Sequence, residues 1–249
     1  MESSLNFMRG REEARALAER EAEERRQRRA ARKRAPARDA AQLSHYERAI
    51  DLSVSRGPSN FSKARDRVSL LFLFLTGMRV SNLRELRATH LRSLLSGNSL
   101  SIPQIKSGGT LTHPIPREYV PLVSRRTEDI NVLLVGRENS DYVITGEQNS
   151  NQQLNRVNLT SRLNALLKAV GQLEGRILTS HSFRIGLTTS IIERFGIDAA
   201  RQILGHSNIA TTSVYSRYTL SPSSIKRILS ARFRRSYKRK SNSKNSSPA

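Results

Sequence analysis

The sequence LGHSNIATTSVY, residues 204–215, sets a glycine, a histidine and a tyrosine around an expected turn between two helices. Gly205 is typical of a helix end, because glycine adopts the left-handed backbone conformation without steric cost. The Ile, Thr and Val residues after it begin the next helical run. His206 and Tyr215 therefore flank a tight turn, and we expect them to converge on one pocket.

Two earlier segments also present cations near helix ends. The motif SHSFR opens an apolar helical run over residues 185–195, and its His181 and Arg184 share one helical face because they are three residues apart. Upstream, the apolar helix Leu70–Leu75 ends at Thr76-Gly77, and Arg79 follows directly at the start of a short helix. Three motifs thus carry polar side chains that a single site can use.

A hairpin is expected between these motifs. Residues 100–105 read as a strand, the sequence SGG at 107–109 as a turn, and residues 110–116 as the returning strand, with Lys106 at the tip. A further short strand is expected at Tyr142–Thr145 and a helix over about 155–169. The predicted fold class is therefore α+β, mostly helical, with a small antiparallel sheet.

These motifs resemble the catalytic domain of the tyrosine recombinases of the phage-integrase family. The resemblance covers roughly residues 43–232 and agrees in order, spacing and flanking residues. The matching positions are Thr76-Gly77-Met78-Arg79 with Leu83 and Leu86 behind them, His181-x-x-Arg184, Leu204-Gly205-His206, and Tyr215 nine residues after His206. The family carries a mobile lysine on a hairpin, which by similarity is Lys106.

The chemistry that the resemblance implies is metal-free cleavage of a phosphodiester. The guanidiniums of Arg79 and Arg184 are permanently charged and can each donate two hydrogen bonds to the non-bridging phosphate oxygens. His206 is a third donor. No carboxylate cluster and no Cys/His metal-ligand spacing accompanies them, so we expect neither a metal nor another cofactor.

Tyr215 is the nucleophile that the resemblance implies, and the product is a 3′-phosphotyrosyl enzyme with a free 5′-hydroxyl. His181 is by similarity the base that takes the phenol proton, and Lys106 the acid that protonates the leaving oxygen. Tyr218 competes for the nucleophile's role, since it lies three residues further on and on the same face of a continuing helix.

Composition supports a nucleic-acid partner. The formal charge is +22 and the isoelectric point near 11.4, which favours association with polyanions. The chain has no cysteine, which excludes disulfides, and Leu70–Leu75 is far too short an apolar stretch to span a bilayer. The expected partner is double-stranded DNA, bound by a homo-oligomer that is a tetramer during strand exchange, in an intracellular compartment that contains DNA.

Three regions are expected. Residues 1–42 form a charged arm, partly helical or disordered, 43–232 the catalytic domain, and 233–249 a basic, Ser/Asn-rich disordered tail. The basic run Arg25–Arg34 fits a phosphate-binding segment, a nuclear localisation signal or an arm that is merely solvated. A helix is expected after Ser221, with an apolar face formed by Ile225, Ile228 and Leu229. This face fits either a neighbouring protomer or the chain's own domain.

Two features depart from the family pattern. Only some 40 charged residues precede the match, so a separate DNA-clamping domain is expected to be absent or reduced to the arm, and an accessory protein is a possible replacement. Asn82 stands where many members carry a carboxylate, so its support of Arg79 is expected to be weaker.

The expected function is that of a site-specific DNA recombinase or integrase that cleaves and rejoins strands without metal or ATP. The alternatives are a catalytically silent DNA-binding protein that keeps the fold, a type IB topoisomerase, and a basic RNA-binding protein.

Overall fold

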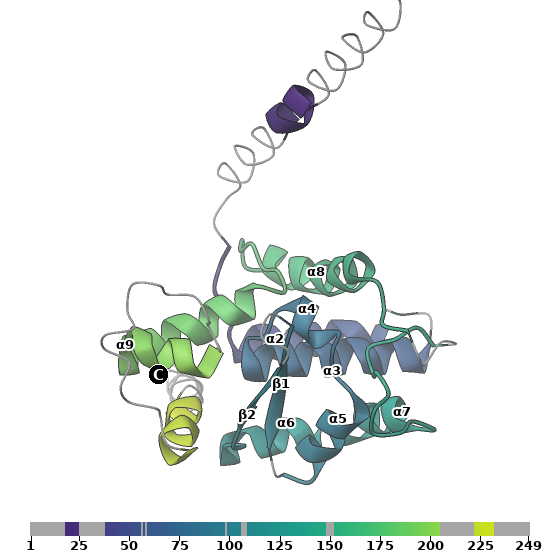
Figure 1. Ribbon diagram of the computed structural model, residues 1–249, viewed down its shortest axis with the longest axis vertical. Helices are drawn as coiled ribbons and strands as arrows, with labels where there is room; N and C mark the ends of the chain where they lie inside the picture. Colours follow the sequence, from purple (N-terminus) through teal and green to yellow (C-terminus); the bar gives the residue numbers. More distant parts are fainter. Residues whose placement is uncertain are drawn as a thin grey trace, which may run out of the picture. The chain divides into compact units, whose positions relative to one another are not determined.

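Helix α3 (Asn60–Thr76) lies at the centre of the protein, as the computed structural model in Figure 1 shows. Its run from Leu70 to Leu75 is buried on all sides. The Ser59 hydroxyl caps the start of the helix by accepting the Ser62 N–H at 3.2 Å. Gly77 ends the helix in the left-handed conformation, with φ 61°, as the sequence predicts.

The structure describes residues 18–24, 38–55, 57, 59–97, 99–105, 109–147, 152–204 and 222–231. The chain divides into two compact units, residues 1–37 and 38–249. Of the first unit, residues 18–24 are described and form an exposed helical segment.

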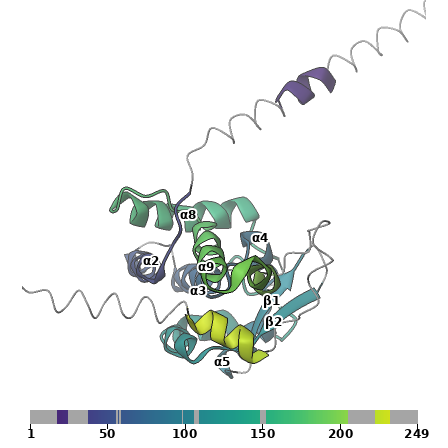
Figure 2. The same ribbon diagram turned by 90° about the vertical axis from the view of Figure 1, so that its left-hand side faces the viewer.

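The helices of the second unit pack around α3. Helix α8 covers one side of the α2 and α3 pair, and α5, α6 and α7 cover the other (Figures 1 and 2). Their bounds are α2 Leu43–Ser55, α4 Val80–Leu83, α5 Ala88–Leu95, η1 Arg117–Tyr119, α6 Val120–Ser124, α7 Thr127–Leu134, α8 Arg156–Gln172 and α9 Ser182–Leu204. None of the described helices is long and apolar enough to cross a membrane.

Aromatic rings join α2, α3 and α9. The Tyr46 and Phe74 rings stack with centroids 4.9 Å apart, and Phe183 meets Phe74 edge-on at 5.9 Å. Helix α9 breaks at Gly196, where φ is 81° and ψ 172°, immediately after the apolar run predicted for residues 185–195. Because Phe183 packs against Phe74, the first half of α9, which also carries Arg184, is fixed directly to the core.

The predicted hairpin is confirmed. Strands β1 (Leu100–Gln104) and β2 (Gly109–His113) pair antiparallel, with Leu100 opposite His113 and Gln104 opposite Gly109. Strand β2 is shorter than predicted and ends at His113, because the prolines at 114 and 116 have no N–H for a continuing ladder.

The strand predicted at Tyr142–Thr145 is wrong. Only isolated bridges form there, between Arg87 and Tyr142 and between Thr145 and Gln153. Arginine side chains hold the described residues of this stretch, 139–147 and 152–154, instead of a strand partner; we call these residues the arginine-held loop. Its contacts run from Arg65 to the Thr145 carbonyl, from Arg84 to the Leu154 carbonyl, from Arg87 to the Ser140 carbonyl and Tyr142 hydroxyl, from Arg92 to the Asn139 side chain, and from Arg137 to the Tyr142 carbonyl and Thr145 hydroxyl.

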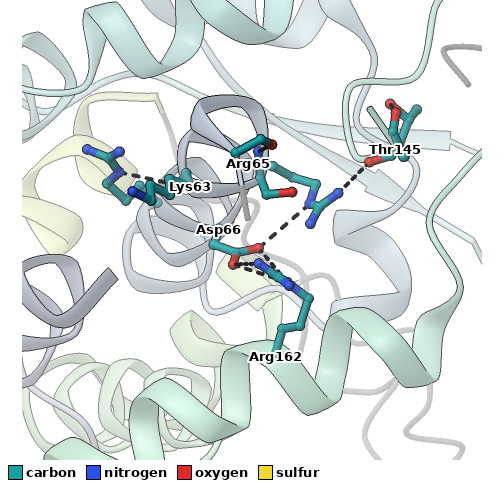
Figure 3. Close-up of polar contacts among 9 residues, drawn as sticks. Lys63, Arg65, Asp66, Thr145 and Arg162 are labelled. Carbon is teal, nitrogen blue, oxygen red and sulfur yellow. Dashed lines mark hydrogen bonds and ion pairs between the residues drawn. The ribbon is translucent and has the colours of Figure 1, made fainter. Parts of the chain in front are cut away.

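A buried ion pair ties α3 to α8. The Asp66 carboxylate accepts from Arg162 Nη2 at 2.6 Å and lies 3.6 Å from Arg65 Nε (Figure 3). Arg65 in turn donates to the Thr145 carbonyl oxygen at 2.7 Å. Because Arg65 and Asp66 are each 4% exposed at the side chain, the Asp66 carboxylate offsets buried positive charge and faces both guanidiniums.

Residues 222–231 form a helix that packs on its own domain. Ile228 and Leu229 are buried, the Ser230 hydroxyl donates to the Glu118 carboxylate at 2.7 Å, and Arg194 binds the Ala231 carbonyl. Within this single chain, the apolar face predicted for the segment is thus covered by the domain that precedes it.

Candidate phosphate-binding site

Arg184 connects the three motifs found in the sequence. Its side chain is buried in the first turn of α9, where Nη1 donates to the Gly77 carbonyl at 2.8 Å and Nη2 to the Leu204 carbonyl at 3.5 Å. Both carbonyls lie at helix ends, where backbone acceptors lack partners within the helix. One guanidinium therefore fixes the segment before Arg79 and the last residue before Gly205.

Gly77 permits this close packing. A Cβ at position 77 would lie 3.0 Å from the Leu187 side chain and 3.3 Å from the Arg184 Cα, and φ is positive. The glycine thus lets the end of α3 rest on the first turn of α9. Arg79 follows as the exposed N-cap residue of α4, close enough to Arg184 and His181 to affect their pKa values.

His181 lies exposed immediately before α9, and its carbonyl accepts the Ile185 N–H at 3.1 Å. Partial burial lowers the pKa of the imidazole, and the positive charges of Arg38, Arg184 and Arg79 lower it further. The ring is therefore neutral at pH 7 and able to accept a proton.

Arg184 remains a cation despite its burial. Burial lowers the pKa of its guanidinium to about 10, and the charge of Arg79 adds to the shift. A group with that pKa is protonated at neutral pH. The described part of the site thus combines two guanidiniums with one neutral imidazole, a set that suits an anionic ligand next to a group that loses a proton.

The structure brings Arg79, His181 and Arg184 together, as the sequence predicts. Lys106, His206 and Tyr215, with the competing Tyr218, lie outside the described residues. Their places in the site stay predictions.

His113 is a residue of this region that sequence reasoning missed. It is 2% exposed, and its Nε2 lies 2.9 Å from the Ile203 carbonyl, which fixes Nε2 as the protonated nitrogen of the neutral ring. Its Nδ1 is buried without a hydrogen-bond partner among the described residues. Burial lowers the pKa of His113, while the bond to Ile203 opposes the shift. The side chain links the hairpin to the end of α9.

Residues 38–42, which we call the leading segment, are also fastened beside the site. The Asp39 N–H donates to the Ile177 carbonyl at 3.0 Å, and the Ala41 N–H donates to the Ser182 carbonyl at 2.9 Å. The Ile177 N–H returns a bond to the Asp39 carboxylate at 2.7 Å. The segment therefore runs along the residues that flank His181, although its composition groups it with the charged arm.

Among the described residues, no three side chains of His, Asp or Glu gather in a group able to hold a metal ion. The three described side chains of the site are two guanidiniums and an imidazole, and none of them is a carboxylate.

Comparison with known proteins identifies relatives. The profile of the phage integrase family matches residues 44–220. The chain is 32% identical over 159 residues to tyrosine recombinase XerA of Pyrococcus furiosus, which is 63% of this chain and 51% of that protein. It is 28% identical over 163 residues to tyrosine recombinase XerA of Thermococcus kodakarensis, covering 64% of this chain and 53% of that protein. The chain spans about half the length of these curated relatives.

Solved structures with similar chains include a XerA recombinase and the catalytic core of lambda integrase. The first is 19% identical, with a TM-score of 0.48, over 78% of this chain and 65% of that one. The second is 18% identical, with a TM-score of 0.47, over 68% of this chain and 96% of that one. The profile match, together with a mostly helical fold that carries one described hairpin, confirms the predicted fold class.

Proposed function

Because this chain belongs to the phage integrase family, we propose that it is a site-specific DNA recombinase that cleaves and rejoins strands through Tyr215. The observation that carries the proposal is the position of Arg184. Its guanidinium binds the carbonyls that precede the Arg79 and His206 motifs, so distant parts of the sequence meet around one cation.

The proposed cleavage step begins with the phenol of Tyr215. Its oxygen attacks the phosphorus and forms the 3′-phosphotyrosyl bond, while His181 takes the phenol proton. The bond from phosphorus to the 5′-oxygen breaks, and Lys106 protonates that oxygen. Rejoining is the reverse reaction, in which the 5′-hydroxyl attacks and the tyrosine leaves, so the bond energy is kept and no ATP is needed.

Arg79, Arg184 and His206 are proposed to stabilise the charge that develops on the two non-bridging oxygens. Guanidiniums suit this task because they donate several N–H groups in a fixed fork and remain charged at neutral pH. The electrostatics of His181 support its role as the base: the cations beside it keep the ring neutral before it takes a proton.

We extend the proposal to the partners. The charge of +22 supports double-stranded DNA as the ligand. Residues 43–232 are proposed to be the catalytic domain, acting as a homo-oligomer that is a tetramer during strand exchange, with an accessory protein as a further partner. The proposed location is an intracellular compartment that contains DNA.

The test is a covalent trap on DNA. A pool of duplexes with randomised sequence, each nicked so that the short 5′-hydroxyl strand diffuses away after cleavage, is incubated with the protein in EDTA. The wild-type protein is expected to form an adduct that resists denaturation, and sequencing of the captured DNA reports the site. Metal-independent chemistry predicts that EDTA leaves the yield unchanged.

Two tyrosine variants form matched controls. Tyr215→Phe is expected to abolish the adduct, whereas Tyr218→Phe is expected to keep it, and mass spectrometry of the trapped peptide identifies the attached residue. An adduct that survives in Tyr215→Phe and disappears in Tyr218→Phe would assign the nucleophile to Tyr218. DNA binding without any adduct would indicate a silent DNA-binding protein.

A further inference from the structure

The leading segment is held against the start of α9 by backbone contacts. Ala41 donates its N–H to the Ser182 carbonyl at 2.9 Å, and Asp39 exchanges two hydrogen bonds with Ile177, one from its backbone and one to its carboxylate. Ile177 and Ser182 lie on either side of His181 in the sequence. The contacts therefore fix residues 39–41 alongside the histidine.

Gly186 makes this approach possible. A Cβ on residue 186 would lie 2.2 Å from the Ala41 carbonyl oxygen, far inside contact distance, so only glycine leaves room for the segment. Ala41 itself is 1% exposed. The segment is thus packed tightly where it crosses α9, and its first residue, Arg38, is held near the site.

Arg38 has the properties of a ligand for an external anion. It is exposed, and no carboxylate among the described residues lies within ion-pair distance of it. The nearest acid in sequence, Asp39, binds the Ile177 N–H. Two other exposed arginines of the domain, Arg48 and Arg176, are paired instead with Glu174.

We propose that Arg38 is a phosphate-binding residue of the recombinase site, supplied by the leading segment and contacting the DNA backbone beside the phosphate held by Arg79 and Arg184. The assignment rests on the proposed function for the identity of its ligand. Electrostatics agrees with the geometry, because Arg38 is one of three cations that lower the pKa of His181, together with Arg79 and Arg184. Those three are the charged groups acting on His181 among the described residues.

Two consequences follow for the reaction. The Arg38 guanidinium adds one phosphate contact to the binding surface, and its charge favours the neutral form of the proposed base. Lysine at position 38 keeps the charge and a donor, so Arg38→Lys is the conservative variant, and Arg38→Ala removes both. Lys168, exposed on α8, provides a matched control for the loss of one positive charge.

The first experiment measures the salt dependence of binding to a 30-base-pair duplex of mixed sequence. Each phosphate contact contributes about 0.9 to the slope of log affinity against log salt. Arg38→Ala is expected to reduce the slope by about 0.9, whereas Arg38→Lys and Lys168→Ala keep the wild-type value. An unchanged slope in Arg38→Ala, or an equal reduction in Lys168→Ala, overturns the assignment.

The second experiment titrates His181 in the free protein by NMR, with the signal assigned through a His181→Asn variant. Arg38→Ala is expected to raise the pKa of His181, and Lys168→Ala to leave it unchanged. Asp39→Ala, which removes one contact of the leading segment, is expected to shift it in the same direction as Arg38→Ala. If Arg38→Ala leaves the pKa of His181 unchanged, Arg38 does not lie beside His181 and the assignment is wrong.

Neither measurement depends on strand cleavage. A wild-type protein that forms no covalent adduct but shows both Arg38 effects would refute the proposed function and leave Arg38 as a phosphate ligand. A protein that forms the adduct but shows neither effect would refute the role of Arg38 alone. Thermal melting of each variant confirms that the fold is intact.

Discussion

Replacing Gly186 with alanine tests whether the leading segment is truly packed on α9. The added Cβ would stand 2.2 Å from the Ala41 carbonyl oxygen and 3.3 Å from the Ala41 carbonyl carbon. The obstacle is backbone, which no side-chain rotation relieves. The segment must therefore move away, and its hydrogen bonds to Ile177 and Ser182 are lost.

The size of the effect follows from these contacts. Three hydrogen bonds fasten the segment, and a hydrogen bond contributes about 1 kcal/mol to the free energy of unfolding. Alanine in place of glycine within a helix raises the free energy of unfolding by about 1 kcal/mol, which offsets part of this loss. We therefore expect Gly186→Ala to lower the free energy of unfolding by about 2 kcal/mol, which corresponds to a fall in Tm of about 4–8 °C for a chain of this size.

Thermal melting followed by circular dichroism measures the change. Gly109→Ala is the matched control, because a Cβ at that position meets nothing within 4 Å, and its Tm should stay close to wild type. Asp39→Ala combined with Gly186→Ala should cost less than the sum of the two single changes, since both release the same segment. A Gly186→Ala protein as stable as wild type would show that the leading segment is not seated as described.

Three further outcomes are expected. Asp66→Asn should lower the free energy of unfolding by about 3 kcal/mol in urea denaturation, because it leaves Arg65 buried without its carboxylate; a loss below 1 kcal/mol would contradict this. His113→Gln, whose amide can donate to the Ile203 carbonyl, should retain more adduct formation than His113→Leu, and equal rates would dissociate this contact from catalysis. Adduct formation should fall as the pH drops below 6.5 through the lowered pKa of His181, since only the neutral ring accepts a proton; a rate that rises toward acid pH would exclude His181 as the base.

Protonation of His113 also links pH to stability. Burial depresses its pKa in the folded state, so the unfolded chain binds the proton more readily. The contribution of the neutral ring to stability is therefore complete above pH 6.5 and is lost as the pH falls toward the folded-state pKa. Urea denaturation at several pH values should show that His113→Gln loses less stability on acidification than the wild type, and parallel losses would contradict this.

Local signals explain what the sequence could predict. A glycine after a long apolar run marked the end of α3 and placed Arg79, and the spacing of His181 and Arg184 put both on one turn. The hairpin was predictable because its turn residues and the apolar strand before them lie close together in the chain. Each of these features depends on residues within a few positions of one another.

Contacts between distant residues explain what the sequence could not predict. Arg184 binds a carbonyl 107 residues away, and nothing in its neighbourhood specifies that partner. In the sequence, His113 is one polar residue in a predicted strand, whereas in the structure its side chain reaches α9. Tyr142–Thr145 has the β-branched and aromatic composition of a strand, but Arg65, which binds its Thr145 carbonyl, comes from α3, 80 residues away in the sequence.

The arginine-held loop also affects how strongly the protein attracts a polyanion before the two come into contact. Unlike Arg65 and Arg162, which face Asp66, arginines such as Arg84 and Arg92 bind carbonyl oxygens without a neutralising anion. Their positive charge therefore still contributes to the electrostatic potential that reaches into solvent. These side chains thereby serve the architecture of the loop and, at a distance, the attraction of a polyanion, so mutating one would slow association at low ionic strength even where it never touches the bound nucleic acid.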